Sequence, residues 1–171
     1  QFSADASSPA HYLLETPCSL LEQSHAKKSF RQKDGWGIAL LKKSKFTIIK
    51  RQYPVYRDTA AFKSAAQKIS SCVTIAHLRA ASNPLKLPMK KLIAPEHNQP
   101  FGHEKLAFAH NGTLNIAAQA REKLLGPYRH RLEGNNDSEI YFWIVYKWFS
   151  KTNSIETSLK KTVEEIWNLW H

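Results

Sequence analysis

Four short polar motifs follow one another along the chain, each beside an apolar run or at a predicted turn. In order they are DGWG, AHLR, AHNG and NDSE, at Asp34–Gly37, Ala76–Arg79, Ala109–Gly112 and Asn136–Glu139. Together they could supply a pair of amide donors, one fixed guanidinium and one fixed carboxylate. That set suits the binding of a free α-amino acid beside a developing oxyanion. No credible nucleophile accompanies them.

The amide donors are those of Asn111 and Gly112, which directly follow the predicted strand Leu106–His110. A β-turn at this point can aim the Asn111 side-chain amide and the Gly112 backbone N–H into a cleft. Two aligned donors are what acyl transfer needs at its tetrahedral stage. Taken alone, however, an Asn-Gly pair is also the common mark of an ordinary hairpin turn.

The charged groups are those of Arg79 and Asp137. Arg79 follows the predicted buried strand Cys72–His77, and a guanidinium there can hold a carboxylate through two hydrogen bonds. Asp137 stands at the predicted start of a helix, where it could bind a ligand ammonium group. A structural ion pair for an isolated Arg and a helix cap for an isolated Asp are the commoner uses, and both stay open.

The elements that must position these residues are a mixture of strands and helices. Apolar alternation and turn residues predict strands over residues 37–41, 46–50, 72–77 and 106–110. Capping residues and apolar periodicity predict helices over residues 59–68, 115–125, 137–149 and 155–170, the first capped by Asp58. A short helical or turn-rich stretch is expected up to His25. A long loop with four prolines spans residues 82–100.

Composition indicates a folded globule. With 171 residues, 42% hydrophobic and 11% aromatic, the chain can form one domain over residues 1–171. The longest apolar run, Ile140–Tyr146, is too short to span a bilayer, and no signal peptide is expected. Two cysteines, Cys18 and Cys72, fit a reducing cytoplasm. The spacings of the histidines match no zinc pattern, so no metal is expected.

The formal net charge of +11 raises the question of nucleic-acid binding. Nine basic residues cluster early in the chain: Lys27, Lys28, Arg31, Lys33, Lys42, Lys43, Lys45, Lys50 and Arg51. They flank a predicted hairpin, where solvent-facing lysines protect sheet edges. The aromatic residues nearby follow the apolar alternation and form no stacking platform. A solvated basic surface is therefore favoured over a nucleic-acid site.

In this order, the four motifs resemble the class II glutamine amidotransferases, which belong to the N-terminal nucleophile hydrolases. Among them the chain looks most like stand-alone members such as the γ-glutamyl amidohydrolase of ergothioneine synthesis. The resemblance runs from about Phe2 to about Phe149. It implies an α+β fold, the four-layer α/β/β/α sandwich, incomplete in this chain. It implies no metal and no organic cofactor.

The resemblance also implies roles for single residues. Arg79 matches the arginine that binds the substrate α-carboxylate, and Asp137 matches the acid that holds the α-amino group. Asn111 and Gly112 match the pair that stabilises the oxyanion. These roles agree with the chemistry expected from the residue types themselves.

Other positions are structural or depart from the family pattern. Asp34 and Trp36 match a segment near the nucleophile and are expected to be structural. Ser82 lies where the family often has Thr or Ser near the glutamine. The loop before the oxyanion strand often reads Asn-x-His-Pro in the family, whereas this chain reads Asn98-Gln99-Pro100. Gln99 in place of the His bears on loop contacts and substrate choice.

The largest departure is the nucleophile, which in the family is a Cys at residue one with its own α-amino group as the base. Gln1 cannot play this part, and Cys18 and Cys72 are interpreted as structural. We therefore expect the Cys immediately upstream of Gln1 and a further portion after His171. The printed chain would then be inactive by itself.

The expected activity is hydrolysis of glutamine or another γ-glutamyl compound, a small-molecule substrate, without a membrane partner. A homo-oligomer stays open. A catalytically inactive, glutamine-sensing domain is the second hypothesis, and a basic nucleic-acid-binding module is the third.

Overall fold

The computed structural model describes residues 1–24, 32–81, 88 and 91–171. The chain forms two compact units, Gln1–Ala109 and His110–His171. Helices and strands both contribute, which confirms the predicted α+β class. In the described part of the chain, no helix is long and apolar enough to cross a membrane. Ser82 and the basic residues Lys27, Lys28 and Arg31 lie outside the described residues.

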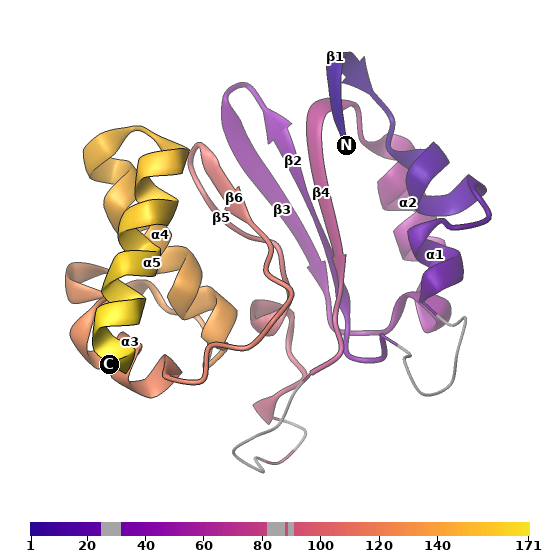
Figure 1. Ribbon diagram of the computed structural model, residues 1–171. Helices are drawn as coiled ribbons and strands as arrows, with labels where there is room; N and C mark the ends of the chain where they lie inside the picture. Colours follow the sequence, from indigo (N-terminus) through magenta and orange to yellow (C-terminus); the bar gives the residue numbers. More distant parts are fainter. Residues whose placement is uncertain (25–31, 82–87, 89–90) are drawn as a thin grey trace. The chain divides into compact units, whose positions relative to one another are not determined.

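The first unit is built on a four-stranded antiparallel sheet with the order β1-β4-β2-β3 (Figure 1). Its strands are β1 (Phe2–Ser7), β2 (Trp36–Lys42), β3 (Lys45–Arg51) and β4 (Ser71–Leu78). The strands predicted over residues 37–41, 46–50 and 72–77 are confirmed. β1 was not predicted, because its small and polar residues show no apolar alternation and its pairing with β4 is a tertiary contact.

Helices cover one face of this sheet (Figure 1). They are the π-helix η1 (His11–Glu15), α1 (Leu20–Gln23) and α2 (Thr59–Lys68), with the short 3-10 turn η3 (Val55–Arg57) before α2. Trp36, Ile38 and Leu78 from the strands pack there against Phe62 of α2. Alternate residues of each strand point to opposite faces, so Gly37, Ala39 and His77 face away from the helices.

The opposite face carries a short hairpin of β5 (Phe101–His103) and β6 (Leu106–Phe108), preceded by the 3-10 turn η5 (Pro95–His97). Gly102 packs against Ile48 of β3, and the Lys50 ammonium lies 4.5 Å from the centroid of the Phe101 ring. The first unit therefore has a helical layer, a sheet and a second small β layer. The strand predicted over residues 106–110 ends two residues early, and β5 was not predicted.

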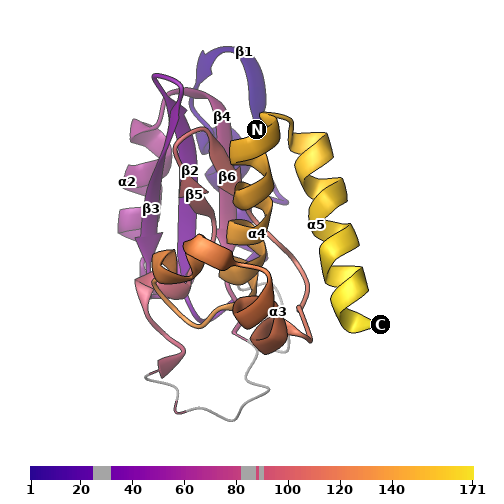
Figure 2. The same cartoon turned by 90° about the vertical axis from the view of Figure 1, so that its left-hand side faces the viewer.

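The second unit is helical. It contains α3 (Ala117–Lys123), the 3-10 helix η6 (Gly126–Arg131), α4 (Asp137–Thr152) and α5 (Ile155–Trp170). α4 and α5 lie side by side and are joined by two residues, of which Asn153 adopts the left-handed conformation common after a helix (Figure 2). Glu165 of α5 ties the pair together by accepting from Lys147 and Trp148 of α4. The predicted helix over residues 155–170 is confirmed.

Candidate functional site

Arg79 follows β4 in the first unit, and its side chain is buried. Its Nη1 donates to the Leu92 carbonyl oxygen at 2.7 Å, which fixes the guanidinium against the loop that precedes the β5–β6 hairpin. A guanidinium keeps its charge at neutral pH, and this hydrogen bond holds it in a defined orientation.

The DGWG segment holds the Arg79 backbone from both sides. The Asp34 N–H donates to the Arg79 carbonyl at 3.0 Å, and the Arg79 N–H donates to the Gly35 carbonyl at 2.9 Å. The buried Asp34 carboxylate also accepts from the Ala81 N–H at 2.7 Å. The structural role of Asp34 is therefore to fix the chain immediately after Arg79, through its bond to Ala81.

The two glycines of the motif make room for the loop that carries Asn98 and Gln99. Gly35 has a φ of +125°, and a Cβ there would lie 2.2 Å from the Asn98 Nδ2. A Cβ on Gly37 would lie 2.4 Å from the carbonyl oxygen of Gln99. Gln99, which departs from the family pattern, thus packs through its backbone against the sheet.

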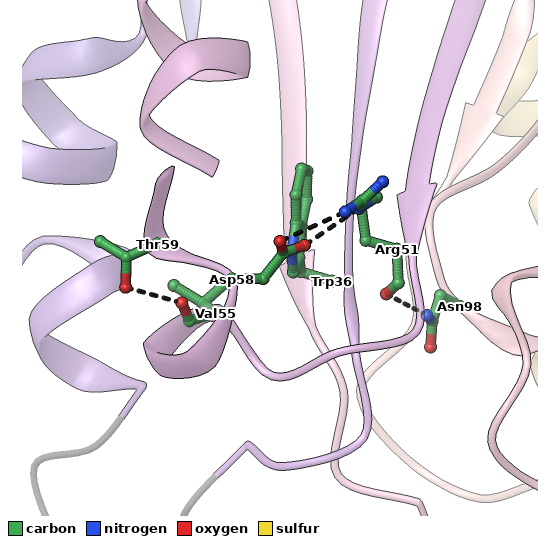
Figure 3. A network of polar contacts seen from close by, with 6 residues as sticks. All are labelled: Trp36, Arg51, Val55, Asp58, Thr59 and Asn98. Atoms are coloured by element: carbon green, nitrogen blue, oxygen red, sulfur yellow. Dashed lines mark hydrogen bonds and ion pairs between the residues drawn. The ribbon is translucent and has the colours of Figure 1, made fainter. Parts of the chain in front are cut away.

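The side chain of Trp36, the third residue of the motif, lies on the face of the sheet that the helices cover, and it belongs to a polar network (Figure 3). Its Nε1 donates to the Asp58 carboxylate at 3.1 Å, and the same carboxylate pairs with Arg51 at 3.0 Å. The Arg51 carbonyl accepts from Asn98 at 2.7 Å. Asp58 is the N-cap residue of α2, as predicted, but its side chain makes no capping hydrogen bond, because its carboxylate binds Trp36 and Arg51 instead.

The electrostatic surroundings of Arg79 favour an anion. Burial lowers the pKa of the nearby His97, and the positive charges of Arg79 and Lys50 lower it further, against a smaller opposing effect of Glu96. His97 therefore stays neutral around pH 7. An anionic ligand at Arg79 would meet a fixed cation and a neutral imidazole.

In the second unit, Asn111 and Gly112 lie on an exposed turn. Within the described residues, neither the Asn111 side-chain amide nor the Gly112 N–H donates a hydrogen bond. The turn is tethered two residues later, because the Leu114 N–H donates to the Asp137 Oδ2 at 2.7 Å. Asp137 thus lies beside the turn, and its second carboxylate oxygen accepts nothing from the described chain.

The first turn of α4 binds two loops. Asn136 caps the helix by accepting from the Ser138 N–H at 2.8 Å, so that the Asp137 side chain is not the cap. The buried Glu139 carboxylate accepts from the N–H groups of Glu133 and Gly134 at 2.7 and 2.9 Å. The NDSE motif is therefore a junction that orders the turn after His110 and the loop before α4.

Three residues of this junction were given no role in it from the sequence, although the first two belong to the AHNG and NDSE motifs: His110, Ser138 and Tyr141. The His110 Nδ1 lies 3.1 Å from the Ser138 Oγ, and its ring meets the Tyr141 ring edge-on with centroids 5.3 Å apart. Burial raises the pKa of Tyr141, so its phenol stays neutral. The i, i+3 spacing of Ser138 and Tyr141 on a helix was the one signal available.

The two cysteines have neutral neighbours. The exposed Cys18 thiol lies 3.9 Å from the Thr16 hydroxyl, and the Cys72 thiol lies 3.9 Å from the Ala4 carbonyl. Neither oxygen can act as a general base at neutral pH. Cys18 also lines a cavity of about 530 Å³ between β4 and the helices η1 and α1, together with Gln1.

Comparison with known families identifies the class of protein to which the chain belongs. A model of the family "Glutamine amidotransferases class-II" matches residues 17–170, so the chain belongs to this family. Its members use the side-chain amide of glutamine.

A solved structure described as a glutamine aminotransferase class-II domain protein, from Silicibacter pomeroyi, has the same fold with a TM-score of 0.58 and 18% sequence identity. The similarity covers 77% of this chain and 55% of the solved chain, so this chain corresponds to about half of that protein. A comparison with curated proteins finds no match.

Proposed function

We propose that the protein hydrolyses the side-chain amide of a γ-glutamyl compound, with glutamine as the simplest substrate. Arg79 binds the α-carboxylate and Asp137 the α-ammonium group. Asn111 and Gly112 donate to the oxygen that becomes negatively charged. One observation carries the proposal. Within the described chain, the Asn111 side-chain amide and the Gly112 N–H donate no hydrogen bond, and the Asp137 carboxylate, which accepts from Leu114 through Oδ2, keeps its second oxygen without a donor.

The proposed nucleophile is a cysteine that precedes Gln1, as the family resemblance implies. Phe2 pairs with Val73, and the Gln1 amine donates to the Thr74 carbonyl at 2.8 Å. In an antiparallel pair, a step back along one strand is a step forward along its neighbour. Residues that continued β1 upstream in this register would run along β4 toward Arg79. This direction supports a nucleophile close to the carboxylate-binding group.

The reaction would proceed in two stages. The thiolate sulfur attacks the side-chain carbonyl carbon, and the carbonyl electrons move to the oxygen that Asn111 and Gly112 hold. The α-amino group of the cysteine takes the thiol proton and gives it to the leaving nitrogen, which departs as ammonia or an amine. Water then attacks the thioester, releases glutamate and restores the thiol. Arg79 and Asp137 contribute by fixing the substrate in the attacking geometry.

The experiment uses the full-length protein, including the residues before Gln1. Glutamate and ammonia are measured after addition of glutamine, and glutamine binding is measured by calorimetry. We expect equal amounts of the two products and a loss of activity of about a hundredfold in Arg79→Lys, because a Lys cannot hold the carboxylate through two bonds. Arg129→Lys is the matched control, since Arg129 forms an exposed ion pair with Glu122.

The other functions are outcomes of the same experiment. Binding of glutamine without turnover would replace hydrolysis by glutamine sensing. If the protein neither binds nor hydrolyses glutamine, the proposal is overturned. Salt-dependent retention on a nucleic-acid column would then select the basic nucleic-acid-binding module.

A further inference from the structure

His110 lies between the exposed turn and the helix α4 of the second unit. Its Nδ1 is 3.1 Å from the hydroxyl of Ser138, which is only 2% exposed. The Tyr141 ring, one helical turn further along, meets the imidazole at 85° with centroids 5.3 Å apart. The ring is therefore held by a hydrogen bond and by an aromatic contact, both from α4.

The other side of the same imidazole contacts the turn. A Cβ on Gly112 would lie 2.9 Å from the His110 Nε2 and 3.3 Å from its Cε1. The chain thus folds back after Asn111 so that Gly112 lies directly against the ring. This close approach also explains why position 112 is a glycine, since a side chain there would collide with His110.

We propose that His110 is a positioning residue that fixes the direction of the two oxyanion donors, Asn111 and Gly112, by seating their turn on α4. The inference rests on the function proposed above, which gives Asn111 and Gly112 their chemical role. His110 itself touches neither the substrate nor the reacting atoms.

Consecutive residues of α4 anchor the turn on both sides. Ser138 holds His110, the residue before the turn, and Asp137 holds the Leu114 N–H, the residue after Thr113. With both anchors in place, the three residues between them have little freedom to rotate. Losing the first anchor leaves the second, so the unit keeps its fold while the donors lose their direction.

The kinetic consequence is specific. Oxyanion donors act mainly on the transition state, so their misdirection lowers kcat and leaves KM nearly unchanged. A role limited to folding would instead lower the stability and leave kcat per folded molecule unchanged. This difference separates positioning from simple packing.

The test uses the full-length protein with three substitutions. Ser138→Ala removes the hydroxyl, His110→Phe keeps a ring but loses its nitrogens, and His110→Asn keeps a polar atom near the position of Nδ1. Ser150→Ala, an exposed serine on the same helix, is the control. The measurements are kcat and KM for glutamine, and hydrogen–deuterium exchange of the segment 110–114.

We expect Ser138→Ala and His110→Phe each to lower kcat at least tenfold with KM within about twofold. The double variant should be no worse than the poorer single variant, because both remove the same anchor. His110→Asn should recover part of kcat, and exchange of the segment should be faster in Ser138→Ala than in Ser150→Ala.

Unchanged kcat, or unchanged exchange in both Ser138→Ala and His110→Phe, would overturn the positioning role. If the unsubstituted enzyme does not hydrolyse glutamine, the proposed function fails, and the exchange measurement alone then decides whether His110 holds the turn. Ser138→Ala deletes a single oxygen atom, so it carries the test even if His110→Phe does not fold.

Discussion

The DGWG segment of the first unit and the turn after His110 in the second unit use their polar groups in opposite ways. Around DGWG, the polar groups form hydrogen bonds within the protein. The Asp34 carboxylate accepts from the Ala81 N–H, and the Gly35 carbonyl accepts from the Arg79 N–H. The Trp36 indole N–H donates to the Asp58 carboxylate. On the turn, the Asn111 amide and the Gly112 N–H find no partner in the described chain. In the sequence, both segments are recognised in the same way, as short motifs of the family pattern.

The difference teaches how to tell a structural motif from a ligand-binding one. Buried polar groups must be satisfied, and a motif that satisfies them internally has no capacity left for a ligand. An exposed motif whose neighbouring residues are anchored to the fold keeps its own polar groups available for a ligand. Substitutions around DGWG should therefore reduce stability first, and substitutions on the turn should reduce catalysis first.

The largest effect is expected for Asn111→Ala. Loss of one oxyanion donor costs about 10²–10³-fold in kcat. Because Asn111 is exposed and makes no hydrogen bond with the residues that the structure describes, the free energy of unfolding should change by less than about 0.5 kcal/mol. Glutamine turnover and thermal unfolding measure the two quantities. Thr113→Ala, on the same exposed turn, is the control, and equal activity of the two variants would contradict the comparison.

Asp34→Ala should show the opposite pattern. It leaves the Ala81 N–H without its acceptor, and the free energy of unfolding should fall by about 2 kcal/mol. Because the same carboxylate fixes the chain after Arg79, KM for glutamine should rise as well. Denaturant unfolding and steady-state kinetics provide the readouts, with the exposed Asp5→Ala as control. A stable Asp34→Ala variant would show that this contact is dispensable.

The sequence predicted the sheet of the first unit well, because β2, β3 and β4 are apolar runs bounded by turn residues. It failed where a tertiary partner decides. β1 is a strand only because β4 lies beside it. The Asp58 side chain makes no capping hydrogen bond, because its carboxylate binds Trp36 and Arg51.

The candidate site shows the same division. Asn111, Gly112, Arg79 and Asp137 could be selected from their order and their neighbours in sequence, and their roles stay proposals. The supporting contacts could not be selected. Nothing in the spacing of His110 and Ser138 indicates that the two side chains meet, since 28 residues separate them. The hydrogen bond from Leu114 to Asp137 depends in the same way on how the loop folds back.

Trp36→Phe tests the structural side of the comparison with a smaller change. The substitution keeps an aromatic ring against Phe62 but removes the hydrogen bond to Asp58, which retains Arg51. We expect a loss of about 1.5 kcal/mol in the free energy of unfolding and little change in kcat. Trp167→Phe is the control, because Trp167 is 55% exposed and should matter little. A similar loss in both variants would show that the Asp58 bond contributes nothing.

The smallest effect concerns pH and His97, in the first unit. Its pKa in the folded protein lies below the usual value of about 6.5, because burial and the charges of Arg79 and Lys50 disfavour the imidazolium. As the pH falls below about 6.5, the unfolded chain binds a proton that the folded protein does not bind, and the free energy of unfolding decreases. His97→Gln removes this group, so its unfolding free energy should depend less steeply on pH between 7 and 5.

His130→Gln provides the comparison for this measurement, because His130 is an exposed histidine of the second unit. Denaturant unfolding at several pH values gives the slopes directly. Equal slopes for the unsubstituted protein and His97→Gln would mean that His97 accepts its proton as easily in the folded state as in the unfolded one. The region around Arg79 would then be less positive than the structure indicates, and its suitability for an anionic ligand would weaken with it.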